Sequence, residues 1–156
     1  MIFSEQTYRF MYAALQEAEK ALEDNEVPVG AVVVKDNKII GRGYNQVERL
    51  KDATAHAEMI ALTAASNHIG EWRLEGASIF VTLEPCTMCT GALLAARISE
   101  LYFASYDTKF GACGSLFNLA EDGRTNHTIK VYSGVYADES KKILKQFFNE
   151  IRRKTN

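Results

Sequence analysis

Residues 79–105 read IFVTLEPCTMCTGALLAARISELYFAS, and this stretch decides the fold. It opens with a short apolar run at 79–82, continues into an alanine- and leucine-rich segment at 87–97, and ends in a strand-like run at 100–105. A strand, a helix and a strand in succession are typical of a βαβ unit, whose two strands are parallel. The sequence therefore predicts an α/β protein with an at least partly parallel sheet.

The flanking segments extend this pattern. Residues 4–25 place apolar side chains at helical spacing behind Ser4, which can act as the N-cap, and residues 55–67 form a second helix-like run before Gly70. The other expected elements are a hairpin of strands 29–34 and 38–44, loops at 45–54 and 107–114, a last strand at 129–135, and a final helix lined by Ile143, Leu144, Phe147, Phe148 and Ile151. Together they predict a three-layer α/β/α sandwich with a mixed sheet of about five strands.

Composition places the chain among ordinary globular proteins. Its 156 residues are enough for one domain, which we expect to span 1–156, and 47% hydrophobic with 24% charged residues excludes disordered and fibrous classes. The net charge of −2 excludes a whole-molecule field that would attract a polyanion. Residues 141–156 nevertheless carry six basic side chains against one acidic, which could contact phosphates or could be an ordinary solvated helix face.

Neither a membrane span nor a secretory leader is expected, because no apolar run approaches ~18 residues and acidic residues follow the first few positions. The sequence thus predicts a cytoplasmic protein without a membrane partner. Three cysteines are an odd number, and two of them form the pair Cys86-x-x-Cys89. A disulfide framework is excluded for this length, and a metal or redox role is favoured.

Zinc prefers thiolate and imidazole ligands, which His56, Cys86 and Cys89 can provide. The i, i+3 spacing puts both sulfurs on one side of a first helical turn, where the helix dipole favours thiolate. We expect His56 and Glu58 to open one helix, the cysteines to open the next, and one Zn²⁺ per subunit to bind between these ends. Three protein ligands leave a position for water, as in catalytic zinc sites, and Glu58 can take and return the proton.

Other interpretations of the cysteines remain open. The zinc could be structural, with a fourth ligand from Cys113, His68 or His127, or the two cysteines could belong to a metal-free core. The pattern His56-x-Glu58 followed by Pro85-Cys86-x-x-Cys89 argues for catalysis, because it is the signature of zinc nucleobase deaminases.

Beyond this motif, the sequence resembles the bacterial tRNA-specific adenosine deaminases over nearly its whole length. The resemblance lies in the segments EVPVGA at 26–31, TAHAE at 54–58, WRL at 72–74, VTLEPC at 81–86, GACGSL at 111–116, NH at 126–127, and in the ending with FF at 147–148 and RR at 152–153. The family converts a wobble adenosine of tRNA to inosine. The resemblance implies a cytidine deaminase-like fold, Zn²⁺ as cofactor and a tRNA anticodon stem-loop as partner.

The same resemblance assigns roles to single residues. Asn45 and the backbone of Ala57 would bind the flipped purine, and Glu58 would act at its N1 and C6 amino group. The residues expected to contact the RNA are Asp107, Lys109, Phe148 and Arg152. Taken without the family, Asn45 fits a turn residue, Phe148 a core residue, and Asp107 with Lys109 a solvated pair.

The family is typically a homodimer, and the small-residue stretch GALLAA at 91–96 could pack against a second subunit or be buried within the monomer. This chain departs from the family pattern at Ala53, usually proline, and at Phe110, usually a small residue. These departures affect the expected shape of the RNA-facing loops and leave the chemistry unchanged.

Two other functions use the same residues. A deaminase of a free base or nucleoside, of the guanine or cytosine type, would need the zinc site without the basic C-terminal helix. A non-catalytic, zinc-stabilised RNA-binding subunit would need no carboxylate beside the ligands, so Glu58 argues against it.

Overall fold

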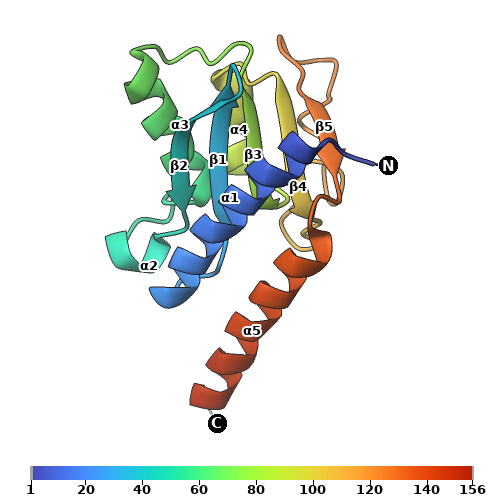
Figure 1. The fold of residues 1–156 in the computed structure, drawn as a ribbon. Helices are drawn as coiled ribbons and strands as arrows, with labels where there is room; N and C mark the ends of the chain where they lie inside the picture. Colours follow the sequence, from blue (N-terminus) through green and yellow to red (C-terminus); the bar gives the residue numbers. More distant parts are fainter. Residues whose placement is uncertain (1, 156) are drawn as a thin grey trace.

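The computed structural model describes residues 2–155, which form one five-stranded sheet with helices on both faces (Figure 1). The strands are β1 (Gly30–Lys35), β2 (Lys38–Tyr44), β3 (Ser78–Leu83), β4 (Glu100–Ser105) and β5 (Lys130–Ser133), and the spatial order is β2-β1-β3-β4-β5. Strand β1 is antiparallel to both β2 and β3, whereas β3, β4 and β5 are parallel. The predicted mixed sheet of five strands is confirmed.

The helices cover the sheet in two layers. They are α1 (Glu5–Glu23), α2 (Val47–Leu50), α3 (Ala57–Ile69), α4 (Thr87–Ala95) and α5 (Ala137–Thr155). Helices α1 and α5 lie on one face, with α3 and α4 behind the other (Figure 1). Strand side chains alternate between two cores, so that Ile79 packs in the α3–α4 core and Phe80 in the α1 core. The three-layer α/β/α sandwich is therefore also confirmed.

Helix α3 packs unusually close to β2. A Cβ atom at Gly43 would lie 2.4 Å from the carbonyl oxygen of Ala57, and one at Gly41 would lie 2.4 Å from that of Ala61. Glycine is required at both positions because the obstructing atoms are helix backbone. This contact fixes the position of α3 along β2, and it thereby fixes the position of the first residue of the helix.

One predicted loop was wrong. Residues 45–54 contain the short helix α2. The carboxylate of Glu26, which is almost fully buried, accepts hydrogen bonds from the backbone N–H groups of Glu48 (2.9 Å) and Arg49 (2.7 Å). A carboxylate at the N-terminal end of a helix satisfies N–H groups that have no partner within the helix. The last strand is also shorter than expected, spanning Lys130–Ser133 rather than 129–135.

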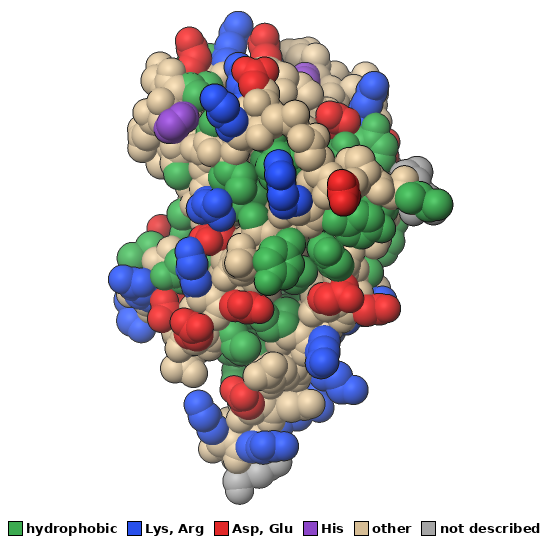
Figure 2. All heavy atoms as spheres, viewed as in Figure 1, with side chains coloured by type: hydrophobic (Ala, Val, Ile, Leu, Met, Phe, Trp, Pro, Cys, Tyr) green, Lys and Arg blue, Asp and Glu red, His purple; other side chains and the backbone are tan. Residues whose placement is uncertain are grey.

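Helix α5 extends past the edge of the sheet (Figure 1). Only Ser140 and Phe147 of this helix are buried, and its last turn carries Arg152, Arg153 and Lys154. Figure 2 shows basic side chains gathered at this lower end of the molecule. None of the helices in the described range has both the length and the apolar character needed to cross a membrane.

Candidate active site

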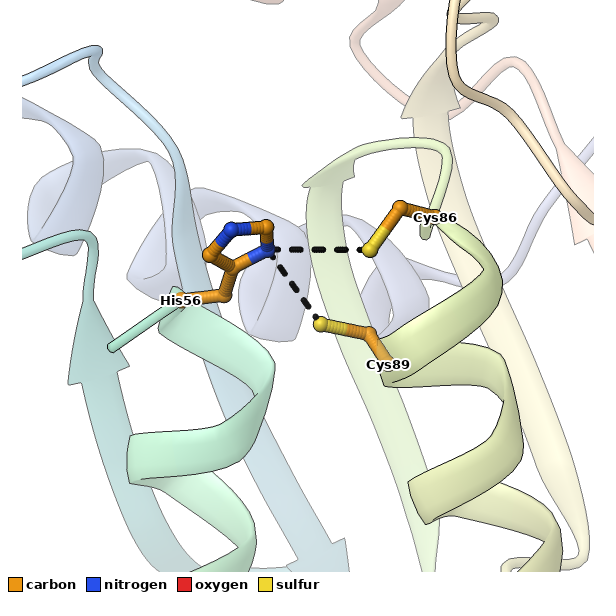
Figure 3. A group of neighbouring side chains, drawn as sticks. All are labelled: His56, Cys86 and Cys89. Carbon is orange, nitrogen blue, oxygen red and sulfur yellow. Dashed lines mark hydrogen bonds between the residues drawn. The ribbon is translucent and has the colours of Figure 1, made fainter. Parts of the chain in front are cut away.

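The candidate metal ligands lie at the first turns of two helices. His56 is the N-cap of α3, Cys86 is the N-cap of α4, and Cys89 lies one turn into α4. The Nδ1 atom of His56 is 3.7 Å from the Sγ atom of Cys86 and 3.5 Å from that of Cys89 (Figure 3). The predicted convergence of these three side chains is therefore present in the structure.

The N-cap positions themselves indicate a function. Ser, Thr, Asp and Asn are preferred there, and replacing them costs a helix ~0.5–2 kcal/mol. Neither His56 nor Cys86 makes a side-chain capping hydrogen bond. Both side chains face the cluster instead, so helix stability at two adjacent termini is given up for the ligand set.

The distances fit a tetrahedral zinc ion. Zinc binds cysteine sulfur at ~2.3 Å and histidine nitrogen at ~2.0–2.1 Å, so a nitrogen and a sulfur on one ion lie ~3.6 Å apart. The observed separations are 3.7 and 3.5 Å, and the three ligand atoms all lie within 4.8 Å of one another. Two thiols and an imidazole are also the donor set that zinc prefers.

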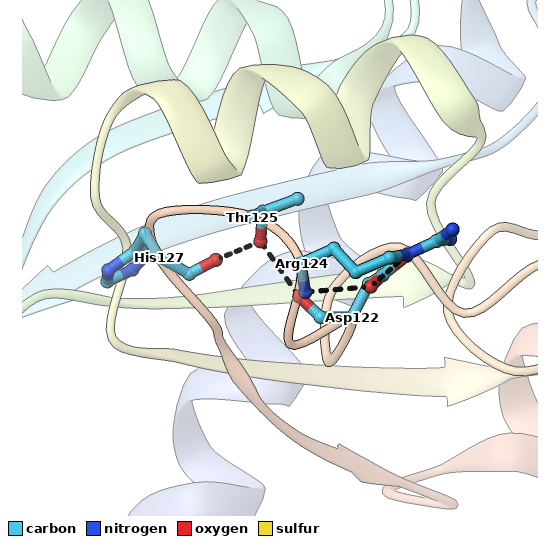
Figure 4. A network of polar contacts seen from close by, with 4 residues as sticks. All are labelled: Asp122, Arg124, Thr125 and His127. Carbon is cyan, nitrogen blue, oxygen red and sulfur yellow. Dashed lines mark hydrogen bonds and ion pairs between the residues drawn. The ribbon is translucent and has the colours of Figure 1, made fainter.

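The other candidate ligands lie elsewhere. Cys113 is buried, with its Sγ atom 3.2 Å from the Oγ1 atom of Thr90, and His68 is in the last turn of α3. The Nε2 atom of His127 is 2.7 Å from the carbonyl oxygen of Ile98. Figure 4 shows His127 in its own loop, which an Asp122–Arg124 ion pair and a hydrogen bond from the Thr125 hydroxyl to the His127 carbonyl hold together. Within residues 2–155, the potential metal-binding group comprises His56, Cys86 and Cys89 alone.

The cluster favours an anionic sulfur. A hydrogen bond from the Cys89 thiol, helped by His56, lowers the pKa of Cys86 to about 3. The same contact raises the pKa of Cys89, and the hydrogen bond with Cys86 raises the pKa of His56. Burial raises the pKa of Glu58 to about 6, an effect that the neighbouring His56 partly opposes. Glu58 is therefore a buried carboxyl group facing the ligand cluster from the first turn of α3.

Asn45 follows β2 directly, and Ala57 opens α3, the helix that packs on this strand. The side-chain nitrogen of Asn45 donates to the carbonyl oxygen of Val27 at 3.2 Å, and its Oδ1 atom accepts from the N–H of Val47 at 3.3 Å. These contacts fix the orientation of a side chain that is almost fully buried. Ala57 is the first residue of α3, where a backbone N–H has no acceptor within the helix.

Three of the four expected RNA-contacting residues come together with Lys145, one of the basic residues of 141–156, and with Asn149, which sequence reasoning missed. Lys109, Phe148 and Arg152 line a surface hollow of about 310 Å³, and Lys145 and Asn149 complete it. Phe148 is 45% exposed and packs edge-on against the buried Phe147. Helical spacing along 145–152 could have indicated the two additional residues, but the sequence does not show that the loop of Lys109 lies beside them.

Asp107 is placed next to this hollow without lining it. Its Oδ1 atom accepts hydrogen bonds from the backbone N–H groups of Lys109 (3.0 Å) and Phe110 (3.2 Å), so it shapes the loop rather than pairing with the lysine side chain. Phe110 is 67% exposed, and Ala53 is exposed in the turn before α3. Both departures from the family pattern therefore lie on the surface.

Comparison with known proteins identifies the family. Residues 4–105 match the cytidine and deoxycytidylate deaminase zinc-binding region. A tRNA-specific adenosine deaminase of Streptococcus pyogenes serotype M18 (strain MGAS8232) is 46% identical over 153 residues, which cover 97% of this chain and 96% of the relative. The chain belongs to the tRNA-specific adenosine deaminases of this zinc-dependent family. It is a zinc-dependent deaminase, as the sequence predicted.

Solved structures agree with this family. One, from studies of A-to-I editing by tRNA:A34 deaminases at the wobble position of transfer RNA, has a TM-score of 0.83 at 44% identity and covers 86% of this deaminase and 98% of that chain. A guanine deaminase from Nitrosomonas europaea has a TM-score of 0.78 at 21% identity, covering 94% of this deaminase and 86% of that chain. The second likeness concerns the cytidine deaminase-like fold alone.

We predict that the purified protein contains one zinc per chain and that Cys86→Ala or His56→Ala removes most of it, because each change takes away one of three ligands. Elemental analysis of the folded protein measures this. Cys113→Ser is the matched control and should keep full zinc content, since Cys113 contacts Thr90 rather than the cluster. Zinc loss in Cys113→Ser with retention in Cys86→Ala would reverse the assignment.

Proposed function

We propose that this enzyme deaminates adenosine at the wobble position of a tRNA anticodon, consuming water and releasing ammonia to leave inosine. The observation that carries the proposal is a buried carboxyl group beside a His-Cys-Cys cluster, in a chain that matches tRNA-specific adenosine deaminases over nearly its full length. Deamination at C6 requires a nucleophilic water and a group that moves protons, and these residues supply both requirements.

His56, Cys86 and Cys89 would hold the zinc ion. When bound, zinc supplies a Lewis acid that makes water nucleophilic near neutral pH. Glu58 takes a proton from the attacking water and delivers protons to N1 and to the leaving amino group at C6. Its position in the first turn of α3, two residues after a ligand, keeps its carboxyl group beside the reacting atoms without making it a ligand.

Asn45 and Ala57 would position the purine. The amide of Asn45 retains one N–H and one lone pair beyond its contacts to Val27 and Val47, so it can bind a base without losing its own support. The free N–H of Ala57 provides a second donor at the start of α3. A base held by both would lie next to the ligand cluster, because Ala57 follows His56 directly in the chain.

The hollow between the 107–114 loop and α5 supports an RNA substrate. It combines three cationic side chains, Lys109, Lys145 and Arg152, with the half-exposed ring of Phe148. Cations contact phosphates, and an exposed aromatic ring can stack on an unpaired base. An enzyme acting on a free nucleobase would have no use for this combination.

Inosine formation tests the proposal. An anticodon stem-loop with adenosine at the wobble position should be deaminated far faster than free adenosine or free guanine, because phosphate and flanking-base contacts offset the cost of unstacking the target. Mass spectrometry of nucleosides after incubation with the zinc-loaded enzyme measures this. Faster turnover of free guanine, or no inosine in the stem-loop, would refute the tRNA assignment.

We predict that Glu58→Gln keeps the fold and the zinc but lowers turnover of the stem-loop by ~10⁴-fold, because the amide matches the carboxylate in size and cannot accept a proton. Single-turnover kinetics and zinc analysis on one preparation distinguish the loss of proton transfer from a loss of zinc. Near-normal turnover at full zinc content would exclude Glu58 as the proton carrier.

We also predict that replacing Lys145 and Arg152 together by alanine weakens stem-loop binding and lowers the slope of log affinity against log salt by about 1.4, the value for two contacts to single-stranded phosphates. Fluorescence anisotropy across salt concentrations measures the slope. Replacing Lys141 and Lys142, exposed on the same helix but outside the hollow, is the charge-matched control and should leave the slope nearly unchanged. Equal effects in both pairs would contradict a specific site.

We further expect a homodimer acting in the cytoplasm, where tRNA is used. Within the 91–96 stretch Leu93 is buried in the monomer, whereas Gly91 and Ala95 on α4 are exposed and could approach a second subunit closely. Light scattering should give about twice 17.4 kDa at micromolar concentration. A mass of 17.4 kDa would overturn this expectation.

A further inference from the structure

Glu84 carries a buried carboxylate that the proposed chemistry does not use. It follows β3 directly, is 2% exposed, and makes no ion pair with any side chain of the described residues. The carboxylate instead accepts hydrogen bonds at 3.0 Å from the backbone N–H groups of Asp107, Cys113 and Ser115, and another from the Ser115 hydroxyl. Three backbone N–H dipoles and one hydroxyl group, rather than a cationic side chain, therefore stabilise this buried carboxylate.

All of these donors belong to one segment, residues 107–115. They lie at both of its ends, so the segment is wrapped around the carboxylate. Gly111 lies against it from the middle of the loop, where a Cβ atom would be 2.3 Å from the carboxyl carbon. The path of the loop thus depends on an anion at this point and on the absence of a side chain at Gly111.

The same residue is joined to the metal cluster by the chain itself. Glu84 is followed by Pro85 and then by Cys86, and the carbonyl oxygen of Pro85 accepts a hydrogen bond from the N–H of Ala112 at 2.9 Å. On its other side, the loop presents Lys109 to the hollow described above. Glu84 therefore connects the turn that carries a metal ligand with the loop that faces the proposed RNA site.

We propose that Glu84 is a positioning residue that sets the 107–115 loop relative to the metal cluster and thereby determines affinity for the RNA around the target base. This inference rests on the proposed function. Strand β3 does not need the carboxylate, because the Glu84 N–H already bonds to the carbonyl oxygen of Ser105 at 2.9 Å. Removing the negative charge of Glu84 should therefore alter the 107–115 loop and leave the sheet unchanged.

Glu84→Gln tests the proposal. The amide has the same size, but its NH₂ group cannot accept from the backbone N–H that it faces, so one loop contact is lost and the charge disappears. We expect the KM for the anticodon stem-loop to rise by ~10- to 100-fold, the range that follows a small misplacement, with kcat changed far less and zinc content unchanged. Anisotropy with the same stem-loop should show a matching loss of affinity.

Two further variants make the test specific. Gly111→Ala disturbs the same contact from the loop side, so it should raise the KM in the same direction and show non-additivity with Glu84→Gln. It also carries the test should Glu84→Gln fail to fold. Glu17→Gln is the matched control, a buried carboxylate on α1 that contacts Lys20 and Arg42, and it should lower the melting temperature without raising the KM.

Hydrogen exchange separates this inference from the proposed function. The amides of Asp107, Cys113 and Ser115 should exchange faster in Glu84→Gln even without RNA, because the amides that face the NH₂ group lose their acceptor and the others bond to an uncharged oxygen. Faster exchange with unchanged KM and RNA affinity would overturn the inference while the tRNA assignment stands. Failure of the wild-type enzyme to act on the stem-loop would instead refute the proposed function, with exchange still reporting whether Glu84 holds the loop.

Discussion

The common direction of β2 and β3 is the constraint on which the site depends. Strand β1 lies between them and is antiparallel to both, so β2 and β3 run the same way and end at the same edge of the sheet. The chain continues from β2 through α2 into α3 and from β3 directly into α4, and the N-terminal turns of α3 and α4 meet there. A histidine that opens one helix and a cysteine that opens the other are thereby brought within bonding distance of one metal ion.

The glycines of β2 fix the distance between α3 and the sheet. Without side chains at Gly41 and Gly43, α3 lies with its backbone on the strand and cannot shift along it without losing that contact. Helix termini on a packed sheet are more rigid than loops, which suits a ligand set that tolerates little variation. Most of the proposed recognition residues lie instead directly after β2, on the 107–115 loop and on the projecting end of α5.

Sequence reasoning succeeded where the determinants are local. The strand and helix order follows from residue periodicity, and the ligand cluster follows from two short motifs that each open a helix. Sequence reasoning failed where the structure depends on contacts between residues that are far apart in the sequence. Helix α2 depends on Glu26, 22 residues before its contact at Glu48, and the hollow joins Lys109 to Lys145 and Asn149 on another element. Nothing in the local composition of 45–54 or 107–114 indicates such partners.

Three of the four buried glutamates among the described residues, Glu26, Glu58 and Glu84, lack a salt bridge and differ in what surrounds them. Glu26 accepts hydrogen bonds from backbone N–H groups of α2, and Glu84 accepts them from the 107–115 segment, so each carboxylate shapes the segment that donates to it. Glu58 instead lies beside the metal cluster, where burial raises its pKa toward neutrality. In the proposed mechanism Glu58 gains and loses a proton in every turnover, a task that does not suit a carboxylate whose hydrogen bonds hold a loop in place, and the two tasks fall to different residues.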